Sequence, residues 1–300
     1  MAALGFALSV LVGVSLGFFG GGGSILTVPL LVYVFALDPK EAIASSLLIV
    51  GAASISGAIQ HWRAGNVELR TALTFGAAGM AGAHLGGRAG TYLDGTLLLL
   101  LFAAMMIITA LAMWRGRRVP KAAVVGKRSL RPLLAQGFGV GLFTGLVGAG
   151  GGFLIVPALA LWAGLPLPAA VGTSLVVIVL NTLAGFSGYA GHVRLDYALV
   201  AGVATCAIAG SFVGTYLAHR VNPTSLRRAF AGFVLAMATV ILVREVDAWL
   251  GTARAALPTS VPQLIFALVV LAIGVATGRV YRKSATDPLP DSAFEQGAGI

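Results

Sequence analysis

A glycine-rich interruption of an apolar stretch occurs twice in this chain, at a constant offset of 128 residues. The first copy begins at Gly17 and the second at Gly145, and 8 of the 17 residues from each starting point are identical. Backbone that leaves its helix within lipid is tolerated only where protein or a water-filled cavity satisfies its polar groups. Paired interruptions in two halves of a membrane protein are typical of transporters. The duplication therefore predicts the class of protein, but not its substrate.

The composition excludes a water-soluble protein. Of the 300 residues, 58% are hydrophobic and 10% are charged, whereas soluble domains average about 25% charged residues. We predict a multi-pass protein of the cell membrane, which is the inner membrane in a Gram-negative bacterium. The net charge is +10, and 7 basic residues without an acidic one lie in segment 115–131. The positive-inside rule places this segment in the cytoplasm. Nucleic-acid binding is not expected, because no soluble domain presents a basic face.

Nine apolar stretches align as two similar sets of four and a final one. The predicted fold is an all-α integral membrane protein with two homologous, inverted repeats. Each repeat contains a broken or re-entrant helix hairpin and three spans, and one extra C-terminal span follows. The predicted boundaries are a first repeat over 1–115, a basic cytoplasmic linker over 116–131, a second repeat over 132–245, a C-terminal span over 246–283 and a polar tail over 284–300.

The first apolar stretch of each repeat is too long for a single span. As one helix, residues 4–36 would extend about 50 Å, against a hydrocarbon core of about 30 Å. Two arrangements fit: a hairpin that re-enters the membrane and returns, or a bent helix that crosses it. Re-entry places the basic residues Arg220, Arg227 and Arg228 on the same side as segment 115–131, as the positive-inside rule requires. We therefore favour seven crossings and two re-entrant hairpins, with the amino terminus outside; the alternative gives nine passes.

The two glycine breaks are the strongest candidates for a binding site. A helix start has unpaired N–H groups and a partial positive charge, and glycine lets a ligand approach the backbone closely. Two such starts, near Ile25 and Phe153, would form an anion site without a buried lysine. The competing interpretation is that these glycines only form tight turns. The candidate residues are Gly22, Gly23, Ser24, Gly150, Gly151 and Gly152.

The second apolar stretch of each repeat adds polar side chains that could reach the same site. They are Ser45, Ser46, Thr173, Ser174 and Asn181. Serine and threonine hydroxyls within helices commonly bond to their own backbone. Asn181 is costly in lipid without a partner, so it faces either another helix or the substrate. The sequence contains no metal-ligand pattern and no P-loop lysine, and we expect no metal, no cofactor and no enzymatic activity.

These features together resemble the sulfite exporter TauE/SafE family of bacterial membrane permeases, over about residues 5–245. The resemblance rests on the breaks leading to Pro29 and Pro157, the pairs Ser45-Ser46 and Thr173-Ser174, and the turns Gly65-Asn66-Val67 and Gly191-His192-Val193. It implies a secondary transporter of small anions such as sulfite, organosulfonates and related sulfur-containing acids. It also implies that Gly22, Gly23, Gly150 and Gly151 face the substrate, with the hydroxyl pairs nearby.

Other functions remain open at this point. A passive anion channel would use the same helix starts without alternating access. A membrane enzyme or a non-transporting subunit is disfavoured, because no nucleophile with a neighbouring base is recognisable. The expected partners are a small anionic substrate and the lipid bilayer. The sequence leaves open whether a coupling proton or sodium ion takes part, and whether the chain forms a homodimer.

Overall fold

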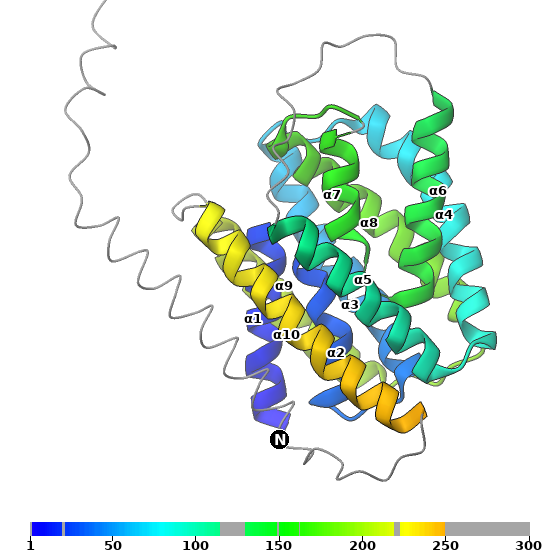
Figure 1. Ribbon diagram of the computed structural model, residues 1–300. Helices are drawn as coiled ribbons and strands as arrows, with labels where there is room; N and C mark the ends of the chain where they lie inside the picture. The colour runs from blue at the N-terminus through cyan, green and yellow to red at the C-terminus, as the bar shows by residue number, and fades with distance from the viewer. Residues whose placement is uncertain are drawn as a thin grey trace, which may run out of the picture.

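The computed structural model describes residues 2–19, 22–114, 130–148, 150–161, 163–218 and 223–249. Every regular element in these ranges is a helix (Figure 1). Most of the predicted basic linker lies outside the described residues, as do the predicted C-terminal span beyond Trp249 and the polar tail.

The helices follow the same order in both halves of the chain. A long helix, a glycine break, a short helix and three long helices occur in turn. The first half contains α1 (Ala2–Phe19), the 3₁₀ helix η1 (Gly22–Leu26), α2 (Thr27–Tyr33), α3 (Pro39–Arg63), α4 (Leu69–Tyr92) and α5 (Gly95–Trp114). The second half contains α6 (Leu130–Val147), α7 (Gly152–Leu161), α8 (Leu167–Tyr189), α9 (Tyr197–Ala218) and α10 (Pro223–Trp249).

Local sequence explains where the long helices begin. Asp38 precedes α3, and its carboxylate accepts a hydrogen bond from the Lys40 N–H at 3.0 Å. Pro39 then occupies the first helical position, where its missing N–H costs nothing. Asp196 precedes α9 in the same way and accepts hydrogen bonds from the N–H groups of Ala198 and Leu199 at 3.0 and 3.1 Å. These side chains satisfy donors that the first helical turn leaves unpaired.

The first apolar stretch turns back on itself. The segment that follows α2 returns to the beginning of α1, because the rings of Phe6 and Phe35 pack edge to face with centroids 5.7 Å apart. Gly5 lies against the same Phe35 ring. At the other end of the hairpin, Gly23 lies against the backbone of Ser15 and Leu16. Residues 4–36 therefore form two antiparallel helical segments joined at the break.

Close helix–helix seams tie each half to the other. The first helix, α1, packs on α9, and α6 packs on α4. Small residues allow these backbones to approach closely, which gains dispersion contacts in lipid. On the first seam Gly13 and Gly17 lie against the backbone of Ala207 and Ser211, and on the second Gly141 and Gly145 lie against the backbone of Gly79 and Ala83.

Further pairings include α4 with α8 and α3 with α9. The helices α3 and α8 also pack together in the interior, where a Cβ built on Gly51 would lie 2.7 Å from Thr182 Oγ1. The helices α5 and α10 lie side by side across one face (Figure 1). The second glycine break lies beside α3, where Gly148 approaches Ile43 and Gly150 approaches Val50.

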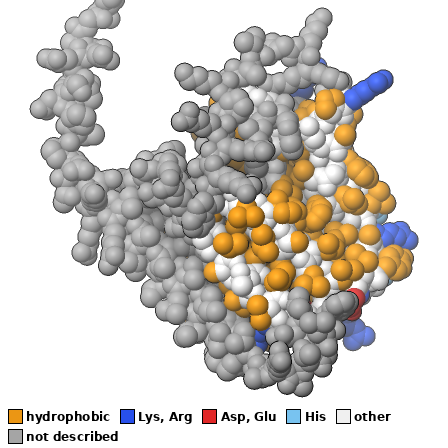
Figure 2. Space-filling view, in the orientation of Figure 1, with side chains coloured by type: hydrophobic (Ala, Val, Ile, Leu, Met, Phe, Trp, Pro, Cys, Tyr) orange, Lys and Arg blue, Asp and Glu red, His pale blue; other side chains and the backbone are white. Residues whose placement is uncertain are grey.

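The outward face of the helices is apolar. Exposed large side chains include Ile59, Trp62, Leu85, Leu183 and Phe212. Figure 2 shows hydrophobic side chains over most of the described surface in that view, with Lys and Arg projecting at its edges. Such a surface suits lipid rather than water. Within the described residues, three helices are long and apolar enough to cross a bilayer, namely Pro39–Arg63, Pro168–Tyr189 and Tyr197–Tyr216.

Candidate functional site

The second glycine break has a backbone conformation that favours glycine. Gly148, Gly150 and Gly151 have φ angles of +75°, +64° and +70°, in the left-handed region that other residues rarely adopt. The helix α7 begins directly afterwards at Gly152, and the N–H groups of Leu154 and Ile155 donate to the Gly151 carbonyl at 2.9 and 2.8 Å. The break therefore presents the start of a 10-residue helix, with its unpaired N–H groups, inside the bundle.

The first break differs from this arrangement. Gly22, Gly23 and Ser24 belong to the 3₁₀ helix η1, which continues into α2 at Thr27. The half-helix thus begins two residues later than the predicted Ile25, and α2 has only 7 residues. The two breaks occupy equivalent positions of the duplicated motif, but the first lies in a 3₁₀ helix and the second at a left-handed turn.

The two breaks meet in the interior of the bundle. A Cβ built on Gly150 would lie 3.4 Å from both Cβ and Oγ of Ser24, and it would collide with the Val50 side chain of α3. Ser24 and Val50 have no exposed surface. One turn before Val50, the Ser46 Oγ lies 2.6 Å from the Gly148 carbonyl oxygen and 2.7 Å from the Ile43 carbonyl oxygen, and its single proton is shared between them. The predicted residues Ser24, Ser46 and Gly150 are therefore brought together.

The remaining predicted hydroxyls have other contacts among the described residues. Thr173 Oγ1 accepts a hydrogen bond from the Glu68 N–H at 2.9 Å, and Ser174 Oγ donates to the Val171 carbonyl at 2.7 Å. Gly172, beside this pair, lies against His61, which is 15 residues or about 22 Å along α3 from Ser46. The two hydroxyl pairs therefore do not form one cluster, and Thr173 supports a loop. Ser45 is buried, and no described residue forms a hydrogen bond with its hydroxyl.

Several buried polar atoms have no hydrogen-bond partner among the described residues. They include Thr27 Oγ1, Ser54 Oγ and both amide atoms of Asn181. Thr27 lies three residues after Ser24, and Ser54 lies four residues after Val50. Each is therefore one helical turn from a residue at the meeting point of the two breaks. Thr27 was not predicted from the sequence. Its spacing of three from Ser24, which puts both hydroxyls on one helix face, is the signal that would have indicated it.

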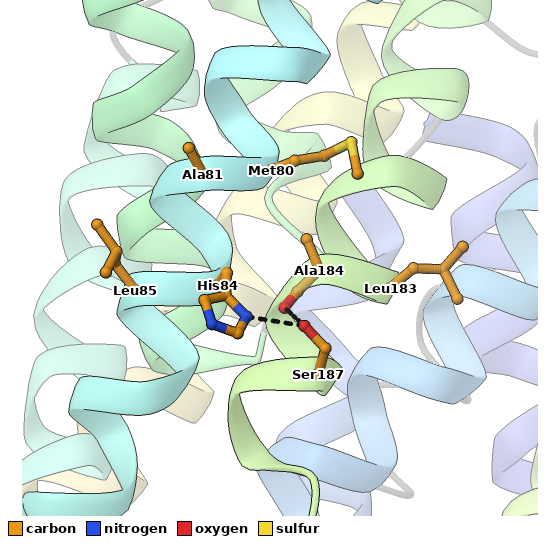
Figure 3. A pocket seen from close by; sticks show the side chains of 7 residues that line it. All are labelled: Met80, Ala81, His84, Leu85, Leu183, Ala184 and Ser187. Atoms are coloured by element: carbon orange, nitrogen blue, oxygen red, sulfur yellow. Dashed lines mark hydrogen bonds between the residues drawn. The ribbon is translucent and has the colours of Figure 1, made fainter.

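Two hollows on the outer surface lie away from the meeting point of the two breaks. The larger, of about 630 Å³, lies between α4 and α8, where the His84 ring points toward Ser187 (Figure 3). His84 Nδ1 and Ser187 Oγ are 2.8 Å apart. The smaller, of about 300 Å³, lies between α3 and α8 and includes Ile59 and Trp62. The break residues line neither hollow, and those described from Gly23 to Ser24 and from Gly150 to Gly152 are buried.

Comparison with known proteins agrees with this architecture. The family model for sulfite exporter TauE/SafE matches residues 5–241. A probable membrane transporter protein of Xylella fastidiosa (strain 9a5c) is 38% identical over 241 residues, covering 78% of this chain and 92% of the relative. The probable membrane transporter protein YdhB of Bacillus subtilis (strain 168) is 28% identical over 223 residues, covering 73% and 91%. No solved structure matches.

Fold, surface and relatives together define a multi-pass transporter of the cell membrane. The chain belongs to the sulfite exporter TauE/SafE family. The matched range contains both glycine breaks and both seams, and it ends at residue 241 within α10.

Proposed function

We propose that this protein is a secondary transporter that moves small anions, namely sulfite, organosulfonates or related sulfur-containing acids, across the cytoplasmic membrane. The observation that carries the proposal is the buried meeting point of the two breaks, where Ser24 lies against Gly150. The family name supports sulfur oxyanions as the substrate class.

The chemistry of this meeting point favours an anion. The start of α7 directs unpaired N–H groups and a partial positive charge toward it. The unpartnered hydroxyls of Thr27 and Ser54 lie one turn away and could donate to a bound oxygen. Ser24, Ser46 and Val50 carry no charge. Neutral donors hold an anion without the strong attraction of a fixed cation, and this allows the anion to be released.

We further propose that the two halves are inverted repeats. The seam contacts support this, because each recurs at an offset of 128 with the halves exchanged. Gly13 against Ala207 corresponds to Gly141 against Gly79, since 13 + 128 = 141 and 79 + 128 = 207. The hairpin formed by α1 and α2 supports re-entry, and hence seven crossings with the amino terminus outside. Inverted repeats provide two alternative conformations that open to opposite sides.

Several further expectations belong to the same proposal. A proton or sodium ion would couple transport to a gradient, and a second copy of the chain would complete a homodimer. The protein would have no enzymatic activity, because transport of an intact anion requires neither a nucleophile nor a cofactor.

Flux through reconstituted liposomes tests the proposal. The purified protein is inserted into vesicles, and movement of sulfite, sulfoacetate and taurine is followed under an imposed gradient. We expect the native protein to show saturable flux. The substitution Ser24→Asp should abolish this flux, because a carboxylate at the meeting point of the two breaks repels the anion. Gly139→Ala is the matched control, since a Cβ at this α6 position has no neighbour within 4 Å.

Two outcomes would contradict the proposal. Absence of flux for every small anion, from vesicles that contain correctly folded protein, would remove the transport assignment. Large unitary currents in electrical recordings would replace the secondary transporter with a passive channel.

A further inference from the structure

Asn181 is an anomaly in the helix core. Its side chain has no exposed surface, and neither Nδ2 nor Oδ1 has a hydrogen-bond partner within the part of the chain that the structure describes. A buried amide that has lost its water and gained no partner is strongly destabilising. The residue sits on α8 against α4, where a Cβ built on Gly79 would collide with Oδ1 and lie 2.9 Å from Nδ2. Gly79 therefore supplies the space that this amide occupies.

The other half of the molecule packs the equivalent place without a polar group. At an offset of 128, Asn181 corresponds to Ala53 and Gly79 corresponds to Ala207. Both alanines are buried. One of the two equivalent pairs of positions thus holds two alanines, whereas the other holds asparagine and glycine. The asparagine is larger than its alanine counterpart, and the glycine is smaller than its own. Helix packing is already satisfied by the alanine pair, so packing does not account for the amide.

The amide lies in the same layer of the bundle as the two breaks. The neighbouring Thr182 lies against Gly51, and the residue before Gly51, Val50, contacts Gly150. The turn of α8 that carries Asn181 therefore contacts the turn of α3 that contacts the second break.

We propose that Asn181 is a specificity-determining ligand of the transported anion, and that it selects anions carrying a hydrogen-bond donor as well as oxygen acceptors. The inference rests on the proposed function. An asparagine side chain offers an NH₂ donor and a carbonyl acceptor, and both are unpaired here. The donor would bind an anion oxygen, and the acceptor would bind an O–H or N–H of the same solute. Hydrogensulfite and hydroxyalkanesulfonates have both groups, whereas sulfate and simple alkanesulfonates offer acceptors only.

A double variant, Asn181→Ala with Gly79→Ala, isolates the amide from packing. It reproduces the residue pair that the other half already accommodates, so we expect it to fold. The measurement is inhibition of sulfite flux by two matched competitors, 2-hydroxyethanesulfonate and ethanesulfonate, which differ by one hydroxyl. The native protein should be inhibited about tenfold more strongly by the hydroxylated competitor, as one well-placed hydrogen bond allows. The double variant should show a ratio near one and a KM for sulfite raised about tenfold.

The single variant Asn181→Leu provides a second test, because it removes the amide and keeps the bulk. A structural role alone predicts unchanged KM and an unchanged competitor ratio in both variants, and that result would overturn the inference. Thr109→Val is the control, since its buried hydroxyl donates to Met105 of its own helix α5; both transport parameters should stay at the native values. If the native protein moves sulfite and the variants behave identically, only the role of Asn181 is lost. If the native protein moves no anion, the proposed function itself fails.

Discussion

Gly23 in the first half and Gly151 in the second occupy equivalent positions of the duplicated motif, but their surroundings differ. Gly151 has a φ of +70° and lies at a turn, whereas Gly23 has no positive φ and lies within a 3₁₀ helix. Gly23 is required because a Cβ there would collide with the backbone at Leu16. The same motif therefore meets two different constraints, one from packing and one from conformation. Similarity of sequence does not impose identical backbone geometry on the two breaks.

The seams show the opposite behaviour. Gly82 and Gly86 on α4 face the carbonyls of Phe138 and Leu142, and Gly210 and Gly214 on α9 face the carbonyls of Val10 and Val14. These four contacts match at an offset of 128. The comparison with the breaks shows that the two halves pack their helices through equivalent contacts, whereas the residues around the meeting point differ between the halves. If the proposed anion binds there, an asymmetric centre within a symmetric framework would give it one preferred orientation.

The largest effect is expected at Gly151. Replacement by alanine places a Cβ in the left-handed region and against Thr144 Oγ1, so both strain and collision oppose folding. We expect a loss of roughly 2–6 kcal/mol of stability, the sum of a backbone penalty and an overpacking penalty. Thermal unfolding in detergent, together with the yield of monodisperse protein, measures it.

The control for this prediction is Gly139→Ala on the preceding helix. Its Cβ meets nothing within 4 Å, and alanine favours a helix interior by roughly 0.5–1 kcal/mol over glycine. Its unfolding temperature should be equal to or above the native value. A Gly151→Ala protein that unfolds at the native temperature would contradict the described conformation of the break. Since this substitution disturbs folding, lost transport would not by itself locate the binding site.

A pair of seam variants tests the equivalence of the halves. Gly86→Ala would bring a Cβ against the Leu142 carbonyl, and Gly214→Ala would do the same against Val14. Each should cost about 1–3 kcal/mol, because backbone carbonyls cannot move aside as flexible side chains can. Equal shifts in unfolding temperature are expected. A large shift for one variant and none for the other would separate the two seams and weaken the repeat interpretation.

Much of this architecture could be predicted from the sequence because it depends on spacing. The glycine breaks follow from local residue types, and the antiparallel return of residues 4–36 follows from the length of that stretch and the placement of basic residues. The positions of side chains across helices could not be predicted in this way. Thr173 accepts a hydrogen bond from the Glu68 N–H, and this contact depends on how α8 packs against the loop before α4. The space for Asn181 likewise depends on Gly79, a residue 102 positions away in sequence.

The smallest effect separates a hydroxyl that links the two halves from one that bonds within its own helix. Ser46 Oγ shares its proton between the Gly148 carbonyl of the other half and the Ile43 carbonyl of its own helix, whereas the buried Thr109 hydroxyl donates to the Met105 carbonyl of its own helix α5. Ser46→Ala should therefore cost about 1 kcal/mol, because a buried carbonyl at the break loses a donor, and Thr109→Val should cost less, because a helix carbonyl also accepts a backbone N–H. Unfolding temperatures of the two variants measure the difference. Equal temperatures would mean that the second break does not depend on α3, and the breaks would then be held by the hairpins alone.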